Sequence, residues 1–119
     1  MQKVPEALGP YRIAVPFGNL LFVSGQVGID PATLKFQGES VQVQARQALE
    51  NLKAVLEEHR SSLGKVLKTT IFLVQMSDFE MVNQVYAEYF KENYPARSTV
   101  AVNALPKGAR IEIEAIASL

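Results

Sequence analysis

Two segments near the C-terminus contain the residues best suited to chemistry. Arg97 begins a predicted strand after the helix-ending sequence Tyr94-Pro95-Ala96, and Glu112 and Glu114 alternate with apolar residues in a later strand. A guanidinium can bind a carboxylate through two parallel hydrogen bonds, and a carboxylate nearby can accept a proton from water. An arginine close to these glutamates would therefore bind a small carboxylic acid and handle its protons.

The alternation in residues 110–117 also allows a simpler interpretation. Side chains of a strand point to two faces in turn, so the isoleucines and alanines of this segment share one face. Its charged residues share the other face: Arg110, Glu112 and Glu114. Such a row of charges is usually solvated. A second arginine, Arg97, at the entry to a neighbouring apolar strand is what favours a binding site over a solvated surface.

The composition excludes several other kinds of site. The chain has no cysteine and one histidine, which excludes disulfides, thiolate metal sites, cysteine nucleophiles and multi-histidine metal sites. That residue, His59, falls in the last turn of a predicted helix, where interaction with the helix dipole is expected instead of catalysis. Ser24 therefore lacks a triad partner. The glycines do not match phosphate-binding spacings. A lysine that forms a Schiff base stays an open alternative, with no pattern to support it. The residues favour an arginine–carboxylate site that needs no cofactor and no metal.

Charge and hydropathy limit the partners and the location. Twelve basic and twelve acidic residues balance, so net charge gives no reason to expect binding to nucleic acid or to an anionic membrane. No apolar run approaches the roughly 20 residues that span a bilayer, and the N-terminus lacks a signal-peptide pattern. We therefore expect a cytoplasmic protein, with residues 1–119 forming a single domain.

Hydrophobic periodicity predicts the order β-β-α-β-α-β-β after an irregular arm at residues 1–10. The first helix is expected to begin after Ser40 and to end near His59, and the second to begin at a capping box formed by Ser77 and Glu80. The strands are predicted at residues 11–15, 20–23, 66–74, 99–102 and 110–117. This order favours an α+β fold with a mixed sheet and both helices on one face. The other face has apolar residues left to bury, which predicts self-association.

Several motifs, in the same order along the chain, resemble those of the RidA/YjgF family. They are Gly9-Pro10-Tyr11, Val23-Ser24-Gly25-Gln26, residues 44–52, Pro95-Ala96-Arg97-Ser98, Leu105-Pro106-Lys107 and residues 111–115. The resemblance extends from about Pro5 to Ala117. It implies a chorismate-mutase-like α+β fold that assembles into a homotrimer with sites in the clefts between subunits.

The resemblance also implies an activity. Family members hydrolyse reactive enamines and imines, such as 2-aminoacrylate, 2-iminopropanoate and 2-iminobutanoate, to 2-oxo acids and ammonia. Arg97 would bind the substrate carboxylate and Glu112 would activate the attacking water. The other residues that this resemblance places around the substrate are Tyr11, Ser24, Gly25 and Asn83. For Tyr11 and Asn83, an ordinary position at the surface or at an interface is the open alternative.

Two positions depart from the family pattern, and two other functions stay open. Thr99 stands where many members have cysteine, which removes a redox-sensitive thiol. Gly28 stands where some members have proline, which is expected to loosen the loop.

A non-catalytic regulatory module that binds small carboxylates would need Arg97 but has no evident use for Glu112. A ribonuclease or translation inhibitor is disfavoured by the balanced charge, because phosphate contacts dominate RNA affinity.

Overall fold

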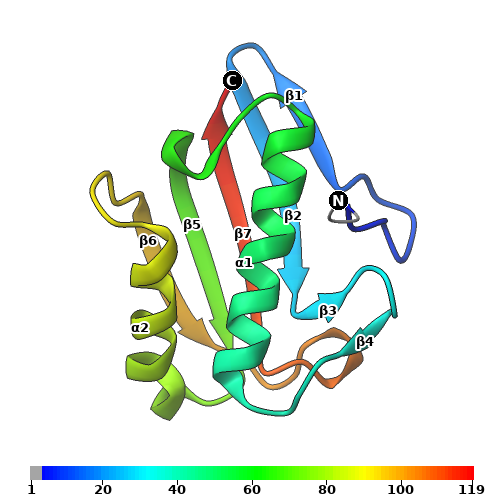
Figure 1. Ribbon diagram of the computed structural model, residues 1–119, viewed down its shortest axis with the longest axis vertical. Helices are drawn as coiled ribbons and strands as arrows, with labels where there is room; N and C mark the ends of the chain where they lie inside the picture. Colours follow the sequence, from blue (N-terminus) through cyan, green and yellow to red (C-terminus); the bar gives the residue numbers. More distant parts are fainter. Residues whose placement is uncertain (1–3) are drawn as a thin grey trace.

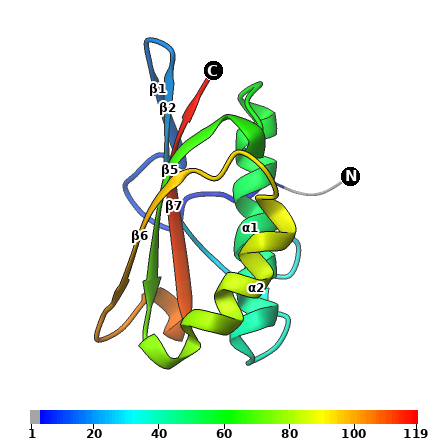
Figure 2. The ribbon, with the colours of Figure 1, turned by 90° about the vertical axis from the view of Figure 1, so that its left-hand side faces the viewer.

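The computed structural model describes residues 4–119, which form a sheet covered on one face by two helices. Figure 2 shows both helices, α1 (Val41–Glu58) and α2 (Phe79–Tyr89), on the same side of the sheet. The strand order is β1-β2-β7-β5-β6, with β5 and β6 parallel and the other neighbours antiparallel. The strands span Ala14–Phe17 (β1), Leu20–Val27 (β2), Val66–Leu73 (β5), Ala96–Ala101 (β6) and Ile111–Ser118 (β7). The mixed α+β sheet with helices on one face is therefore confirmed.

The helices and the remaining short elements complete the chain between these strands (Figure 1). The longer helix, α1, lies over β2 and β7, and α2 lies beside it at the β5–β6 edge. A small hairpin, which the periodicity did not predict, precedes α1. The bounds are Ile29–Asp30 (β3), Lys35–Phe36 (β4), Val41–Glu58 (α1) and Phe79–Tyr89 (α2), with 3₁₀ turns at Leu63–Lys65, Met76–Asp78 and Pro106–Gly108.

Helix α1 begins and ends as its sequence predicts. The Ser40 hydroxyl accepts a hydrogen bond from the Val43 backbone N–H at 3.2 Å, which satisfies one of the free donors of the first turn. At the other end His59 is the C-cap, and its Nδ1 lies 2.9 Å from the Val55 carbonyl oxygen. The apolar residues between them recur on one face and are buried against the sheet.

The start of α2 differs from the predicted capping box. Met76–Asp78 form a 3₁₀ turn, so Ser77 lies inside that turn, and the cap residue, Asp78, makes no capping bond with its side chain. The Asp78 carboxylate is instead buried against Arg110, whose Nη2 donates to its two oxygens at 3.0 and 3.1 Å. The prediction that Arg110 shares a face with Glu112 is also wrong, because β7 begins one residue later and the guanidinium turns towards Asp78.

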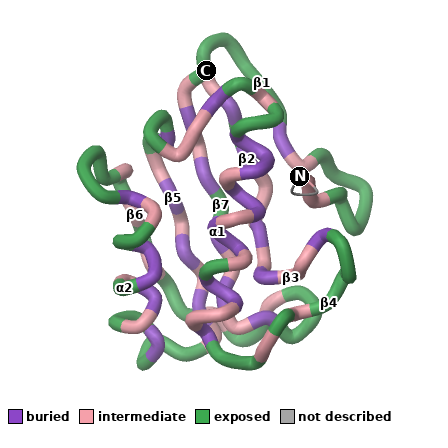
Figure 3. Tube along the Cα trace, viewed as in Figure 1, coloured by how far each residue is buried: buried purple, intermediate pink, exposed green. Residues whose placement is uncertain are grey.

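The core lies between the helices and one face of the sheet, and Figure 3 shows buried residues along both α1 and the central strands. Alternate residues of β7 are buried there, and Leu21 and Val23 of β2 and Ile71 and Leu73 of β5 join them. Phe22 points the other way and is 42% exposed, so β2 is covered by its own chain on one face only. We call this uncovered side the open face of the sheet.

Two other predicted strand starts also move. Residues 11–13 precede β1, because pairing with β2 begins at Ala14, so Tyr11 is not part of a strand. Strand β6 begins at Ala96 instead of Thr99, which puts Arg97 inside the sheet. Of the predicted arm, residues 4–10 contain no helix or strand, and residues 1–3 lie outside the described part of the chain.

Gly28 lies where β2 leaves the sheet and passes close to α1. A Cβ atom on Gly28 would overlap the backbone of Gln44 in α1. Only glycine allows two backbones to approach so closely. The structure thus gives a packing reason for glycine at this position. None of the helices formed by residues 4–119 has both the length and the apolar character needed to cross a membrane.

Candidate functional site

Arg97 lies on β6, at the edge of the sheet, with its side chain on the face that carries the helices. Its position opposite Thr69 of β5, a buried residue, determines this orientation. The guanidinium is held by two neutral groups. Nη2 donates to the Asn83 Oδ1 atom of α2 at 2.6 Å, and Nε donates to the Thr99 hydroxyl oxygen at 3.0 Å. The structure therefore brings Arg97 and Asn83 together, as the sequence predicts.

Two aromatic rings of α2 also contact the Arg97 guanidinium. Its central carbon lies 4.9 Å from the centre of the Tyr86 ring and 5.4 Å from that of Phe79. These distances are typical of cation–π contacts. The Tyr86 hydroxyl is 2.7 Å from that of Thr69, and burial raises the pKa of Tyr86, which keeps the ring neutral. The rings restrict the guanidinium without neutralising it.

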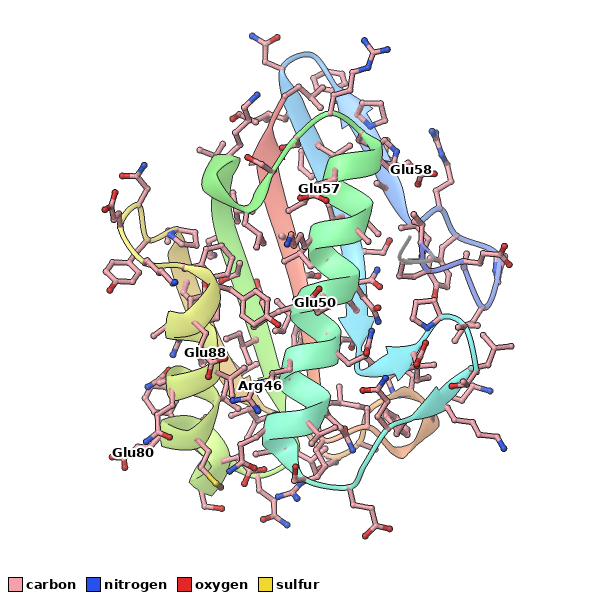
Figure 4. All side chains as sticks on the ribbon, in the orientation of Figure 1. Arg46, Glu50, Glu57, Glu58, Glu80 and Glu88 are labelled. Carbon is pink, nitrogen blue, oxygen red and sulfur yellow. The ribbon has the colours of Figure 1, made fainter. Side chains whose placement is uncertain are left out.

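The charge of Arg97 is not compensated by any described acidic residue. Arg110 pairs with Asp78, and Arg46 of α1 pairs with Glu88 of α2 on the outer surface of the helices (Figure 4). Arg97 forms no such ion pair within residues 4–119 and borders a hollow of about 360 Å³. The other residues around this hollow are Asn83, Tyr86, Ala87, Tyr94 and Pro95. A positioned, unneutralised guanidinium beside a small hollow is suited to bind a small anion.

Glu112 lies on β7 with its side chain on the open face, because its neighbours Ile111 and Ile113 point into the core. Its carboxylate packs against Gly25, where a Cβ atom would lie 2.5 Å from Oε2. Burial raises the pKa of Glu112, and the negative charge of Glu114 raises it further. A carboxylate with a raised pKa is a better proton acceptor near neutral pH than an ordinary glutamate.

The contact between Gly25 and Glu112 depends on an irregularity in β2. The pairing of β2 with β7 shifts between Val23 and Gln26, so Ser24 and Gly25 form a bulge opposite Glu114, and Gly25 lies against the Glu112 side chain. Bulges often occur next to active sites, where they redirect backbone and side chains. The Ser24 hydroxyl donates to the Arg12 carbonyl oxygen at 2.7 Å, which ties the segment before β1 to this bulge.

Tyr11 belongs to the same segment, residues 11–13. The residue is 48% exposed, and its hydroxyl oxygen accepts a hydrogen bond from the Leu8 backbone N–H at 3.3 Å. Ser24, Gly25 and Glu112 thus form one group on the open face, with Tyr11 on the segment attached to it.

Arg97 and Glu112 are not brought together within one chain. Arg97 faces the helices, since its partners Asn83 and Tyr86 are on α2, whereas Glu112 lies on the open face. The expectation of a guanidinium near carboxylates is therefore not met inside a single subunit. The reason is the register of β6 on β5, which pairs Arg97 with a core residue. The two groups can meet only if they come from different copies of the chain.

Arg97 has three contacts that its sequence motif did not predict: Thr99, Tyr86 and Phe79. Thr99 is two residues from Arg97 on the same strand, and this spacing places both side chains on one face. Phe79, Asn83 and Tyr86 recur at helical spacing and therefore share a face of α2. Both spacings are visible in the sequence, but the position of β6 next to α2 is not. Among residues 4–119, no group of three or more acidic or histidine side chains is placed to hold a metal ion.

Comparison with known proteins finds relatives that match nearly the whole chain. The family model described as "Endoribonuclease L-PSP" matches residues 1–119. A RutC family protein of Pyrococcus horikoshii is 49% identical over 98% of this chain and 92% of its own length. The human protein named 2-iminobutanoate/2-iminopropanoate deaminase is 44% identical over 97% of this chain and 84% of its own length.

A solved structure shows the same fold. RidA from the Antarctic bacterium Psychrobacter superimposes with a TM-score of 0.94 at 44% identity, covering 98% of this chain and 94% of that one. The match therefore includes every element that positions Arg97 and Glu112, from β2 to β7. Relatives matched over nearly the whole chain include a protein named as an imine deaminase. The chain belongs to the RidA/YjgF family.

Proposed function

We propose that this protein hydrolyses short enamino and imino acids, such as 2-aminoacrylate, 2-iminopropanoate and 2-iminobutanoate, to 2-oxo acids and ammonia. The observation that carries this proposal is Arg97, whose guanidinium is held in place by neutral groups and so keeps its charge available for a substrate carboxylate. The name of the human relative, 2-iminobutanoate/2-iminopropanoate deaminase, supports the same class of substrate.

In the proposed reaction Arg97 binds the carboxylate and Glu112 acts as the general base. Glu112 takes a proton from water as the water oxygen attacks the imine carbon, and it passes this proton to the imine nitrogen, which gives a carbinolamine. Glu112 then takes the proton of the carbinolamine hydroxyl as the new carbonyl forms. It delivers this second proton to the amine, which leaves as ammonia when the C–N bond breaks. One imine and one water are consumed, and one 2-oxo acid and one ammonia are formed, without a cofactor or metal.

The proposed site requires more than one subunit. Because Arg97 and Glu112 lie on opposite faces, we propose that Arg97 and Asn83 of one subunit meet Glu112, Gly25, Ser24 and Tyr11 of a neighbour. A homotrimer of the chorismate-mutase-like type, as the family resemblance implies, would supply such clefts. Exposed apolar residues support an interface on the open face and at the β1–β2 end, where Phe22 is 42% and Phe17 is 77% exposed. We expect the protein to act in the cytoplasm.

The direct test generates the imine in solution with a dehydratase that releases 2-aminoacrylate from serine. We expect the protein to speed the appearance of 2-oxo acid and ammonia and to reduce trapping of the imine by semicarbazide. Dialysis against a chelator should leave this rate unchanged. An imine lifetime that does not depend on the protein would overturn the proposal.

Arg97→Lys and Glu112→Gln should fail in different ways. A lysine keeps the positive charge but loses the planar fork, which should weaken binding by roughly 1.5–3 kcal/mol and reduce turnover as well. The glutamine cannot accept a proton, so turnover should fall by about 10²–10⁴-fold while affinity for an unreactive 2-oxo acid stays close to wild type. Steady-state kinetics and calorimetric titration separate these results. If both variants lost only affinity, a non-catalytic carboxylate-binding module would explain the site better.

No observation favours ribonuclease activity, although the matching family model carries that description. The single histidine ends α1, where its Nδ1 lies 2.9 Å from the Val55 carbonyl oxygen, and basic and acidic residues balance. We therefore propose no nucleic-acid partner.

A further inference from the structure

The hydrogen bonds of Arg97 leave one defined part of its guanidinium open. An arginine side chain has five N–H donors: one on Nε and two on each terminal nitrogen. Nε–H is used by Thr99 at 3.0 Å, and one N–H of Nη2 is used by Asn83 at 2.6 Å. The remaining donors are the two on Nη1 and the second on Nη2, for which residues 4–119 provide no acceptor.

This arrangement selects between the two ways in which a guanidinium can bind a carboxylate. In side-on binding the two oxygens accept from Nε and one terminal nitrogen, and in end-on binding they accept from Nη1 and Nη2. Thr99 already occupies the Nε donor, so the side-on mode is closed. Tyr86 and Phe79 contact the guanidinium at 4.9 and 5.4 Å and limit its rotation. A carboxylate is therefore received at the Nη1 end of the guanidinium.

We infer that Thr99 is a positioning residue of the substrate site, which, with Asn83, sets the direction in which Arg97 receives the substrate carboxylate. The inference rests on the proposed carboxylate-binding role of Arg97. It gives Thr99 a function of its own, beyond the absence of a cysteine thiol at this position. Both anchors are neutral, so they orient the guanidinium without competing for its charge, as a glutamate or aspartate would.

The role of the Thr99 hydroxyl can be tested with two substitutions. Valine has nearly the shape of threonine and suits a strand equally well, but it cannot accept a hydrogen bond from Nε. Serine keeps the hydroxyl and loses only a methyl group. Thr99→Val therefore removes the anchor, and Thr99→Ser is the matched control. Thermal unfolding of both variants shows whether each is folded.

The first measurement concerns the protein without ligand and does not depend on any activity. In the nitrogen–proton NMR spectrum, the Nε–H of Arg97, assigned by comparison with Arg97→Lys, should exchange slowly with water in the wild type and in Thr99→Ser. In Thr99→Val it should exchange roughly 10-fold faster or more, since its acceptor is gone. Equal exchange in folded wild-type and Thr99→Val protein would overturn the inference.

The second measurement is calorimetric titration with 2-oxobutanoate and with its uncharged amide. Thr99→Val should bind the acid roughly 10-fold more weakly, Thr99→Ser should bind it about as well as the wild type, and binding of the amide should not change. If the wild type does not hydrolyse imines but Thr99→Val still loses affinity for the acid, the deaminase proposal fails and the positioning role stands. If the wild type hydrolyses imines and Thr99→Val matches it in affinity and rate, the positioning role fails.

Discussion

At the scale of single residues, the environment of Glu112 makes its ionised form less stable. Its carboxylate packs against Gly25 and lies near Glu114 on the same face of β7, and both burial and this second negative charge raise its pKa. In the native state the ionised form is therefore disfavoured relative to an unfolded chain, where the carboxyl is fully hydrated. A general base benefits from the same shift that makes its charged form less stable.

We expect the rate of imine hydrolysis to fall with decreasing pH, with a midpoint above the ordinary glutamate value of 4.5. The reason is that a base must be ionised to accept a proton, and the raised pKa moves its protonation to higher pH. Glu114→Gln removes one of the two causes, so its midpoint should lie lower than that of the wild type. Initial rates measured between pH 4 and 8 check both points. A midpoint that did not respond to Glu114→Gln would argue against Glu112 as the titrating group.

The free energy of unfolding should also depend on the Glu112 carboxyl. Its contribution should decrease as pH rises, whereas the rate of hydrolysis should increase. Between the unfolded and the raised folded pKa the native state binds more protons, so this contribution to the free energy of unfolding decreases as pH rises through that window. Glu112→Gln removes the cost and should be at least as stable as the wild type at pH 7, with the difference vanishing below about pH 4. Urea unfolding at both pH values measures this. A Glu112→Gln protein less stable at pH 7 would show that the carboxylate stabilises the fold.

At the scale of elements, the bulge in β2 controls where the Glu112 carboxylate can lie. A methyl group at residue 25 would lie 2.5 Å from Oε2, so Gly25→Ala should displace the carboxylate. The carboxylate is the end of a flexible side chain, and stability should change little. A displacement of about 1 Å in a catalytic group can reduce turnover by roughly 10²-fold, and we expect a loss approaching this size.

Gly64→Ala is the matched control for this prediction, because the nearest atom to its new methyl group would be the Ser62 hydroxyl oxygen at 3.8 Å. Turnover and thermal unfolding of the two variants provide the comparison. If Gly25→Ala kept full turnover, the position of the Glu112 carboxylate would not matter for catalysis.

The elements themselves were largely predictable from local patterns. The Ser40 cap, the helical spacing of α1 and the alternation in β7 are local signals, and each agrees with the structure. The cap of α2 was not predictable, because Asp78 is bound by Arg110, which is 32 residues away in the chain. The β3–β4 hairpin has two residues in each strand, too few to show an alternation of apolar and polar residues.

The candidate site was predictable in part, for the same physical reason. Arg97, Glu112 and Asn83 are recognisable by residue type and motif, but the face to which each points depends on strand register. Register is set by pairing between distant segments, here Thr69 with Arg97, and a shift by one residue would reverse the face. Thr99 shares the face of Arg97 because it is two residues away on the same strand, whereas Tyr86 becomes evident as a partner only once β6 is placed beside α2.

At the scale of the whole molecule, the open face of the sheet leaves apolar surface without a cover from its own chain. It contains a hollow of about 360 Å³ whose apolar lining includes Val15, Phe22 and Ile116, and whose polar lining includes Lys68 and Glu114. Burial of such a face between copies of the chain would remove it from water.

We therefore expect multi-angle light scattering to give three times the mass of one chain at micromolar concentration. Phe22→Lys places a charge on the open face and should shift the mass towards that of a monomer, because an unpaired charge is costly to bury at an interface. The control is Leu34→Lys, which changes an equally apolar residue in the β3–β4 turn, 68% exposed and away from the open face. A wild-type mass of one chain would remove the basis for a shared site.

The opposite orientation of Arg97 and Glu112 has a consequence in genetics. If each functional pair takes one residue from each of two chains, Arg97→Lys and Glu112→Gln are defects that co-assembly can repair. Equal amounts of the two variants, unfolded and refolded together, should regain about a quarter of the wild-type sites, because that share of random neighbours combines an intact arginine with an intact glutamate. A cell that carries both alleles would then regain activity that neither allele provides alone, which is interallelic complementation. A chain with both substitutions could not rescue either single variant in this way, because it supplies neither intact residue to its neighbours.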